Sequence, residues 1–477
     1  MKRTPTVLCL ILAGVGMLMA IGCNGEEETP VAAARREKVD AAVREKHGRS
    51  LEDLPEVTLV VISPNNRNIE REFAEAFSLH HAIEHGRRVT IDYRDVSGGG
   101  NAILDNLRKT YAGSKEKVKS AGIDIVWGGG EDNFMKMTDE GILQPMTIPE
   151  SFREHVPAVF GGLPMYDQDG HWAGTAISAF GILYNKGMLD RLKLAHPRTW
   201  DDLGEGKYFD LVVLADPTQS SSAAAVNEMV VQSGKDWPDG WAKLLDILGN
   251  AKKFFTGASD AANAVTSIAP VATCIDFYGS MRVSRHPEQL EYVSPAGQTA
   301  LTPDPIGILK NPPHPELAQR FVDFVLSRRG QALWALPVGA HHGPVHKPLF
   351  RTPIRRDVFT AYKGKLLGGI SDPFATGEEM KLDLQMRNVR FGLLRHLVRA
   401  AALDNREGLK QAKKALIESN FEATRARLFY ALPPNVRTRE QIEQIAPQLL
   451  DDTDRDRIVT GWSTFFREQY RKVIDLP

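Results

Sequence analysis

The stretch Ile123-Asp124-Ile125-Val126-Trp127-Gly128-Gly129-Gly130 is a short apolar run that ends in three glycines. An apolar run of this length, bounded by turn residues, predicts a buried strand at 123–127, and a helix is expected from about 132 to 140. Two earlier segments, with strands predicted at 57–62 and 89–96, lead in the same way into helices expected between Asn66 and Gly86 and at about 101–111. Three strand–loop–helix units in succession predict a parallel sheet covered by helices, with functional loops at the carboxyl ends of its strands.

The pattern starts again in the middle of the chain. Residues 172–184 are apolar and interrupted by small residues, which predicts two strand segments or a crossing between domains. Further strands are predicted at 211–215, 273–277, 290–294 and 306–309, and a strongly amphipathic helix at 315–326. The sequence therefore predicts a second α/β unit that returns to the first.

Composition agrees with two folded units. The chain has 477 residues, of which 42% are hydrophobic and 25% charged, as expected of a soluble protein with two cores. Lys and Arg number 59 against 60 Asp and Glu, which gives a formal net charge of -1. Because no excess of positive charge is present, no nucleic-acid partner is expected.

The N-terminus has the layout of an export signal. Lys2 and Arg3 precede an apolar run at 7–21 that is too short for a comfortable membrane span. Ala20-Ile21-Gly22-Cys23 resembles a bacterial lipobox, which implies a signal peptide at 1–23 and a lipid on Cys23. The alternative is a simple secretory signal with a coincidental cysteine. Residues 24–56 contain few large apolar side chains and are expected to be a tether with some helical character.

Three loops are suited to an oxyanion. Ser97-Gly98-Gly99-Gly100 and the three glycines 128–130 each lie between a predicted strand and a predicted helix, and Ser220-Ser221-Ser222 begins another helix. Helix N-termini carry positive partial charge, and glycine lets a ligand approach the backbone N–H groups. Together the loops favour one anion in a cleft, although each alone is also explained as turn chemistry. Neither glycine loop has a nucleotide-binding pattern.

Two side-chain groups could bind metal. His81, Glu84 and His85 match the His-x-x-Glu-His pattern of zinc peptidases, beside the buried stripe of their helix, but histidines at a helix C-terminus are also stabilised by its dipole without metal. Asp276 and Tyr278 share one face of a predicted strand that also holds Cys274. This pair could bind a hard cation, hydrogen-bond a ligand, or be a satisfied core pair.

Several segments, in this order, resemble the bacterial extracellular solute-binding proteins, nearest to the ferric-iron type of ABC-transporter binding protein and its relatives that take small anions. The segments are Ile62-Ser63-Pro64-Asn65-Asn66, Asp124-Ile125-Val126-Trp127-Gly128-Gly129-Gly130, Ala215-Asp216-Pro217-Thr218-Gln219-Ser220, Cys274-Ile275-Asp276-Phe277-Tyr278-Gly279, Asp304-Pro305-Ile306-Gly307 and the helix at 314–334. The resemblance covers about 57–344.

The resemblance implies a type II-like two-lobed periplasmic-binding fold of the α/β class. Lobe 1 would comprise 57–175 and 305–345, lobe 2 would comprise 176–304, and 346–477 would be a helical C-terminal extension that caps lobe 1 or contacts a partner. The implied function is capture of a small solute, with no catalytic residue and no cofactor, and delivery to an ABC permease with its ATPase at the periplasmic face of a bacterial membrane. The implied ligand contacts are Asn65, Asn66, Ser97, Gly98, Gly129, Gly130, Ser178, Ser220, Ser221, Ser222, Asp276 and Tyr278.

One departure from the family bears on the solute. Ferric-binding members of the family carry two adjacent tyrosines, whereas here Phe277 precedes a single Tyr278. The sequence therefore leaves two kinds of solute open. One is Fe(III), with Tyr278 and Asp276 as ligands, and the other is an anionic or phosphorylated compound. The rival functions are an exported zinc hydrolase that uses His81, Glu84 and His85, and a cell-surface interaction scaffold.

Overall fold

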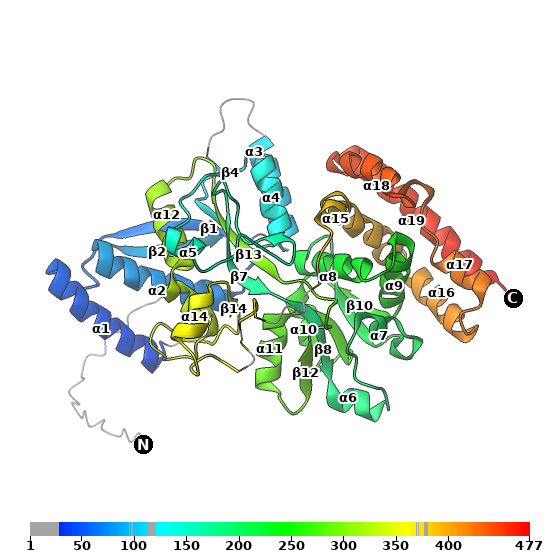
Figure 1. Ribbon diagram of the computed structural model, residues 1–477, viewed down its shortest axis with the longest axis horizontal. Coiled ribbons are helices and arrows are strands. Elements are labelled where there is room, and N and C mark those ends of the chain that lie inside the picture. The colour runs from blue at the N-terminus through cyan, green and yellow to red at the C-terminus, as the bar shows by residue number, and fades with distance from the viewer. Residues whose placement is uncertain are drawn as a thin grey trace, which may run out of the picture.

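The computed structural model describes residues 28–94, 96, 99–112, 120–368, 370, 372–375 and 380–477. The predicted signal peptide at 1–23, with Cys23, lies outside the described residues. Among the residues that are described, no helix has the length and apolar character needed to cross a membrane. Figure 1 shows two α/β lobes side by side and a group of helices from the C-terminal part of the chain, drawn in orange and red, beside the second lobe.

The first lobe is built on a mixed sheet of order β14-β7-β13-β3-β1-β2, with β4 paired to β13. β1 pairs in parallel with β2 and β3, as the repeated strand–loop–helix units predict, whereas β13 is antiparallel to its neighbours β3 and β7, and β14 is antiparallel to β7. Leu59 and Val61 belong to the core on one face of this sheet, and Ile62 and Val126 to the core on the other. Burial on both faces explains why β1 is almost continuously apolar. The strands are β1 (Glu56–Ile62), β2 (Arg88–Arg94), β3 (Ile125–Trp127), β4 (Leu143–Gln144), β7 (Ala173–Ser178), β13 (Thr302–Leu309) and β14 (Thr352–Pro353).

Helices cover both faces of this sheet. Phe73 and Phe77, on the predicted stripe of α2, contact Trp127 of β3 and Phe321 of α12 edge to face, at centroid distances of 4.9 and 5.0 Å respectively. The amphipathic helix predicted at 315–326 is α12 and packs here. The elements are α2 (Arg67–His85), α3 (Gly100–Ala112), α4 (Glu131–Asp139), α5 (Glu150–Arg153), α12 (Pro315–Leu326), α13 (Arg328–Ala335), α14 (Arg356–Ala361) and the hairpin β5 (Val159–Phe160) and β6 (Leu163–Pro164).

The segment predicted to be a tether contains a docked helix, α1 (Pro30–His47). Thr29 caps this helix and donates to the carbonyl oxygen of Val345 at 2.8 Å, and Arg35 donates to the carbonyl oxygen of Gly343 at 2.6 Å. The predicted helical character is confirmed, whereas the prediction of a tether missed the docking of this helix because it counted only large apolar residues. Ala32, Val39 and Val43 lie at helical spacing and form a narrow buried stripe of small side chains.

The second lobe has a sheet of order β10-β9-β11-β8-β12. Its strands are β8 (Phe180–Asn185), β9 (Val212–Ala215), β10 (Ala251–Phe255), β11 (Val271–Ile275) and β12 (Leu290–Val293). Its helices are α6 (Lys186–Arg191), α7 (Trp200–Gly204), α8 (Ser221–Gln232), α9 (Trp237–Gly249), α10 (Ala258–Ala264) and α11 (Asp276–Arg285). The chain crosses from lobe 1 to lobe 2 between β7 and β8, and returns between β12 and β13.

Asp276 and Tyr278 do not share a strand face as predicted, because β11 ends at Ile275 and both residues lie in the first turn of α11. The Asp276 carboxylate accepts the backbone N–H of Phe277 at 2.8 Å, which satisfies one of the free N–H groups at this helix start. Gly279 lets the helix lie against Tyr292, since a Cβ there would meet the Tyr292 ring at 2.3 Å. The sequence predicted a strand that continues to Phe277 because Phe277 is apolar, whereas β11 ends at Ile275.

The C-terminal extension packs on lobe 2, so the prediction that it caps lobe 1 was wrong. Its contacts reach α8 and α9 through Arg390–Glu228 at 2.6 Å, Lys413–Asp246 at 2.5 Å and a hydrogen bond from Trp237 to Val436 at 2.7 Å. The predicted start at 346 also falls too early, because β14 joins the sheet of lobe 1. The helices of the extension are α15 (Leu384–Val398), α16 (Arg406–Glu418), α17 (Ala423–Phe429), α18 (Arg439–Ile445) and α19 (Asp452–Asp475), with a π-helical turn at Arg399–Leu403.

Candidate functional site

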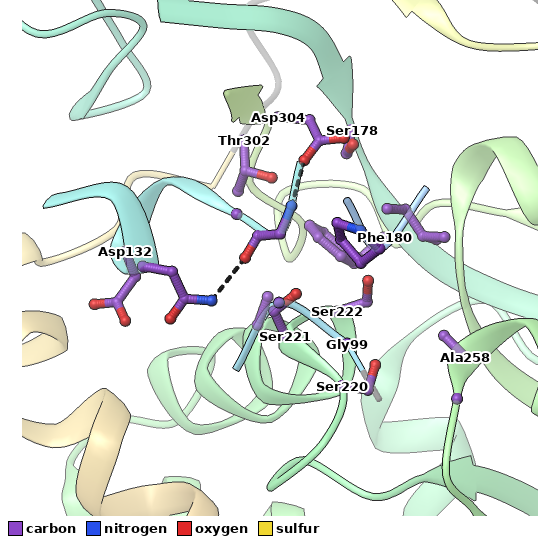
Figure 2. A pocket seen from close by; sticks show the side chains of 18 of the residues that line it. Gly99, Asp132, Ser178, Phe180, Ser220, Ser221, Ser222, Ala258, Thr302 and Asp304 are labelled. Atoms are coloured by element: carbon purple, nitrogen blue, oxygen red, sulfur yellow. Dashed lines mark hydrogen bonds between the residues drawn. The ribbon is translucent and has the colours of Figure 1, made fainter. Parts of the chain in front are cut away.

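A cavity of about 320 Å³ lies between the two lobes. Figure 2 shows Ser220, Ser221 and Ser222 of lobe 2 on one side of it, and Ser178, Thr302 and Asp304 of lobe 1 on the other. Lobe 1 further supplies Pro64, Asn65, Gly99, Gly100, Gly129, Gly130, Glu131, Asp132, Asn133, Pro303 and Arg351. Lobe 2 further supplies Phe180, Ala225, Thr256, Gly257, Ala258, Ser259, Asp260, Ile275, Phe277 and Tyr278, and Arg387 and Phe391 come from the extension.

Most of the residues that the sequence predicts as ligand contacts line this cavity. They are Asn65, Gly129, Gly130, Ser178, Ser220, Ser221, Ser222 and Tyr278. Asn66 and Asp276 are not among the lining residues. Asn66 instead caps α2, where its Oδ1 accepts the N–H groups of Asn68 and Ile69. Ser97 and Gly98 lie outside the described residues.

The N-terminus of α8 forms one wall of the cavity. Ser220 is its cap, and the Ser220 hydroxyl accepts the N–H of Ala223 at 3.3 Å. Ser221 and Ser222, in the first turn, bring two further hydroxyls to the cavity lining. A helix start with hydroxyls beside it presents positive partial charge and hydrogen-bond donors to a bound oxyanion.

The glycine loop after β3 is held by its own protein partners. Gly129 donates its N–H to Oδ1 of Asp304 at 3.0 Å, and its carbonyl accepts from Asn133 at 2.8 Å, as the dashed lines in Figure 2 show. In this structure a carboxylate of lobe 1 accepts the Gly129 N–H, which the sequence predicts to be a ligand donor. The hydrogen bond from Gly129 helps to hold Asp304 in place, and Gly130 is the N-cap residue of α4.

A buried arginine that sequence reasoning missed lies at the centre of the lobe 1 wall. Arg351 is 1% exposed, and its guanidinium donates to Asp304 at 2.7 Å and to the Ser178 hydroxyl at 2.7 Å. It also lies over the Phe277 ring at 4.5 Å. Its Nε has no hydrogen-bond partner among the described residues. The cavity lining thus holds a buried ion pair whose arginine has its Nε unpaired among the described residues, and this arginine comes from a segment between α13 and β14 that carries no recognisable motif.

Burial changes the protonation of the acidic groups near Arg351. It raises the pKa of the Tyr278 phenol to about 12, against the opposing effect of the Arg351 charge. It also raises the pKa of the Asp276 carboxyl to about 6, again opposed by Arg351. At neutral pH Tyr278 is therefore a neutral hydrogen-bonding group. Cys274, the thiol on β11, is buried and its pKa is raised by that burial.

The lobes touch directly at one edge of the cavity. The N–H of Gly99 donates to the carbonyl oxygen of Gln219 at 3.0 Å, and the side chain of Asn101 donates to the carbonyl oxygen of Pro217 at 3.2 Å. A Cβ at Gly99 would meet the Gln219 oxygen at 2.6 Å, so the close approach of the lobes requires glycine there. This arrangement is a closed one, in which the cavity is bounded by both lobes.

The zinc motif does not assemble a metal site. His81 is buried, with its Nδ1 at 2.8 Å from the Arg87 carbonyl oxygen, whereas Glu84 is exposed and pairs with Lys46 at 2.9 Å. In the described part of the chain, no group of three or more His, Cys, Asp or Glu side chains could hold a metal ion. The prediction that His81 lies beside the buried stripe was wrong. Its imidazole fills the space between Phe77 and His85 instead.

These histidines line a second cavity, the histidine cavity, of about 290 Å³ on the outer side of α2. Arg329 approaches His80 at 3.3 Å, and Arg320 approaches His81 at 3.4 Å. Burial, helped by Arg329, lowers the pKa of His80 to about 4, and burial lowers the pKa of His81 as well. Both imidazoles are therefore neutral at pH 7 and face arginine donors. The remaining lining residues are Phe77, His85, Asp323, Phe324 and Ser327.

Comparison with known proteins agrees with this geometry. Residues 121–356 match the family model of the bacterial extracellular solute-binding proteins. The phosphoglycerate transport regulatory protein PgtC of Salmonella typhimurium is 30% identical over 161 residues, which are 34% of this chain and 40% of that protein. Iron uptake protein A1 of Synechocystis is 24% identical over 254 residues, 50% of this chain and 65% of that protein. The chain thus spans less than two thirds of the length of both relatives.

A solved structure shows the same fold. The apo ferric ion-binding protein A of Pasteurella haemolytica superimposes with a TM-score of 0.52 at 15% identity, over 72% of this chain and 96% of that one. At this identity the likeness establishes the architecture alone. The expected two-lobed fold with added C-terminal helices is confirmed, and the interlobe cavity lies where its lobes face each other. Residues 121–356, just under half of the chain, match the bacterial extracellular solute-binding proteins by sequence, and the two-lobed fold agrees with that match.

Proposed function

We propose that this protein is the solute-binding component of an ABC importer and that it captures a small organic anion, carrying a phosphate or carboxylate, in the interlobe cavity. The observation that carries the proposal is Arg351, a fully buried cation in the cavity lining with a donor nitrogen unpaired among the described residues. An arginine held in place by Asp304 and Ser178 offers fixed donors to an oxyanion at little cost in side-chain entropy.

Of the four carboxylates that line the cavity, Asp260 is exposed, and the other three do not oppose an anion. These three each have a cationic partner within 2.7 Å, namely Asp304 with Arg351, Glu131 with Arg387 and Asp132 with Lys136. Their charges are therefore locally compensated. The first turn of α8, with the hydroxyls of Ser221 and Ser222, adds positive partial charge on the opposite lobe. The name of the Salmonella relative, which refers to phosphoglycerate transport, supports a phosphorylated solute.

The mechanism is binding and delivery. Groups from both lobes enclose the solute, so its affinity is highest when the lobes are closed, and release requires them to separate. We expect the closed, loaded form to be recognised by a permease whose ATPase drives opening and import. We also propose that Cys23 carries a lipid that holds the protein at the periplasmic face of the membrane, which a mass increase on the mature N-terminal peptide would establish.

Ferric iron is the second candidate solute, favoured by Tyr278 in the cavity lining and by the name of the Synechocystis relative. Two features weigh against it. The raised pKa of Tyr278 disfavours the phenolate that Fe(III) requires, and the Arg351 guanidinium, which lies over the neighbouring Phe277 ring, adds positive charge beside a trivalent cation.

A thermal-shift panel separates these solutes. The purified protein is melted with 3-phosphoglycerate, glycerol 3-phosphate, glycerate, inorganic phosphate, citrate or ferric ion, and each hit is titrated by calorimetry. We expect organic phosphates or carboxylates to raise Tm, because a ligand that binds only the folded state stabilises it. A rise with ferric ion alone, accompanied by a visible phenolate-to-iron absorption band, would overturn the anion proposal. No rise with any compound of the panel would do the same and would favour the scaffold function.

A further inference from the structure

The first helix of the extension, α15, joins both lobes at the mouth of the interlobe cavity. On the lobe 2 side, Arg390 pairs with the buried Glu228 of α8 at 2.6 Å, and Gln232 and Asp383 exchange two hydrogen bonds. On the lobe 1 side, Arg387 pairs with Glu131, the first residue of α4, at 2.5 Å. The same helix therefore contacts two of the helices whose N-terminal residues line the cavity, α4 and α8.

Arg387 itself lines the cavity and is 2% exposed. Its Nη2 pairs with Glu131, whereas its Nη1 has no hydrogen-bond partner among the described residues. A buried guanidinium with an unused donor is unfavourable unless a further acceptor is supplied. Phe391, one turn later on α15, also lines the cavity, and the Arg387 guanidinium lies 5.0 Å from its ring centre. These two side chains are the contribution of the extension to the cavity lining.

Arg387 and Arg351 have different partners in the cavity lining. The charges that act on the pKa of Arg387, after the effect of burial, are those of Glu131, Asp132 and Glu228. Arg351 acts on Asp276 and Tyr278, and is anchored on Ser178 of β7 and Asp304 of β13. Each arginine thus has its own carboxylate partner and its own unpaired nitrogen.

We infer that the C-terminal extension completes the solute site, and that Arg387 selects a solute with a second anionic group, separated from the group that Arg351 holds. This inference rests on the proposed capture of an organic anion and narrows it to compounds with an acidic group at each end, such as a phosphate at one end and a carboxylate at the other. Arg387, which would select solutes with a second anionic group, lies outside residues 121–356, the part of the chain that matches the family model.

The test compares a solute that has a charged group at both ends with solutes that have a charged group at one end. Dissociation constants of 3-phosphoglycerate, glycerol 3-phosphate and glycerate are measured by calorimetry on the full chain, the Arg387→Gln variant and an Arg399→Gln control. Arg399 lies on the same helical stretch, is half exposed and pairs with Asp404 away from the cavity. The full chain is expected to bind 3-phosphoglycerate at least tenfold more tightly than either compound with one charged end. Arg387→Gln is expected to abolish that preference, and Arg399→Gln to retain it.

A folding defect is kept apart from a binding defect by a second variant. Arg387→Gln leaves Glu131 buried without its partner, so the Glu131→Gln/Arg387→Gln variant, which removes both charges, is measured beside it and both are checked by thermal melting. Equal affinity of the full chain for 3-phosphoglycerate and glycerol 3-phosphate would overturn the inference and leave the anion proposal intact, as would a preference unchanged in both folded variants. Failure of every anion to bind the full chain would overturn the proposed function itself, and the inference with it.

Discussion

The interlobe cavity and the histidine cavity are of similar volume, and arginines line both, yet the arginines have opposite kinds of partner. In the interlobe cavity, Arg351 and Arg387 each pair with a carboxylate, and a helix start with hydroxyls lies opposite. In the histidine cavity, Arg320 and Arg329 face imidazoles whose pKa values are lowered by burial, and Arg320 has only a longer contact, of 3.7 Å, with the exposed carboxylate of Glu316.

Both cavities contain arginines, so residue type alone does not determine what each cavity can bind. The group that each arginine contacts makes the difference. Arginines fixed by carboxylates keep their geometry and leave donors for a ligand. Neutral histidines beside arginines offer lone pairs that the arginines already use. The interlobe cavity also belongs to two lobes and changes when they separate, whereas the histidine cavity is formed by α2, α12 and α13 of one lobe.

The largest expected effect is that of Arg351→Gln. Loss of the charge should weaken 3-phosphoglycerate binding by about 100-fold, since each tenfold change corresponds to ~1.4 kcal/mol and charged hydrogen bonds contribute ~1.5–3 kcal/mol. It should also lower the free energy of unfolding by ~3 kcal/mol, because Asp304 is left without its buried partner. Calorimetry and urea denaturation measure the two effects.

The matched control for Arg351 is Arg329→Gln in the histidine cavity. Arg329 contacts His80 rather than a carboxylate, so the free energy of unfolding should change by no more than ~0.5 kcal/mol and solute affinity should not change. The Arg351→Gln/Asp304→Asn variant should recover part of the lost stability without recovering binding. Equal losses for Arg351→Gln and Arg329→Gln would remove the distinction between the two cavities.

The next largest effect concerns lobe closure. In Gly99→Ala, the added Cβ meets the Gln219 oxygen of the other lobe, so only the closed state is strained. Affinity falls with the population of the competent state, and we expect a loss of about tenfold or more with little change in Tm of the empty protein. Small-angle scattering with saturating solute should show a larger radius of gyration than in the parent.

Gly100→Ala provides the contrast within one lobe. Its Cβ would meet the Gly129 oxygen at 2.4 Å, and both residues belong to lobe 1. The open and closed states are strained alike, so stability should fall by ~1–3 kcal/mol while the ratio of open to closed protein stays constant. If Gly99→Ala instead lowered stability as much as Gly100→Ala and left affinity intact, the contact between Gly99 and Gln219 would not be a closure contact.

The pH dependence of stability should differ in sign between the two cavities. His80 has a pKa of about 4 in the folded protein, and its unfolded value is ~6.5, so between these values the unfolded state binds more protons and stability rises with pH. Asp276, near the interlobe cavity, has a folded pKa of about 6 and an unfolded value of ~3.9, so its contribution falls as pH rises across that window.

Single substitutions should separate these two slopes. His80→Gln should flatten the rise in unfolding free energy between about pH 4.5 and 6.5, and Asp276→Asn should steepen it, each by on the order of 1–2 kcal/mol once solvent screening is allowed for. Urea denaturation at intervals of half a pH unit measures both. If both variants changed the slope of unfolding free energy against pH in the same direction, the protonation states assigned to His80 and Asp276 would be wrong.

Much of the fold follows from local sequence pattern. The strands of the first three units, the crossing at 172–184 and α12 were predicted because burial on both faces leaves continuous apolar runs and because helical spacing marks α2 and α12. The start of α11 was missed because Phe277 continued the apolar pattern past Ile275. The docking of α1 was missed because its buried stripe consists of small residues.

Apart from Ser178, which is the last residue of β7, the predicted residues that line the cavity follow the ends of strands with a parallel neighbour. Ser220, Gly130 and Asn65 lie in loops at strand ends, which sequence patterns mark directly. Arg351 and Arg387 come from segments with no motif, and their position depends on packing between elements far apart in the chain. The solvent exposure of a single side chain is the property that local sequence pattern predicts least well. An arginine is exposed in most proteins, and only the tertiary structure identifies these two as buried.

The smallest expected effect, that of Tyr278→Phe, tests which solute the interlobe cavity holds. If the solute is an organic anion, the phenol contributes at most one neutral hydrogen bond beside the fixed charge of Arg351, and its loss should weaken 3-phosphoglycerate binding by less than about fivefold. If the solute is ferric iron, the same change removes the only phenol among the residues that line the cavity, and iron binding should be abolished. His81→Gln is the control, because the zinc interpretation of the histidine cavity predicts loss of metal there, whereas neutral imidazoles held by Arg87 and Arg320 predict none. A small change in Tyr278→Phe together with a large change in Arg351→Gln would mean that charge, and not a metal ligand, determines what this cavity binds.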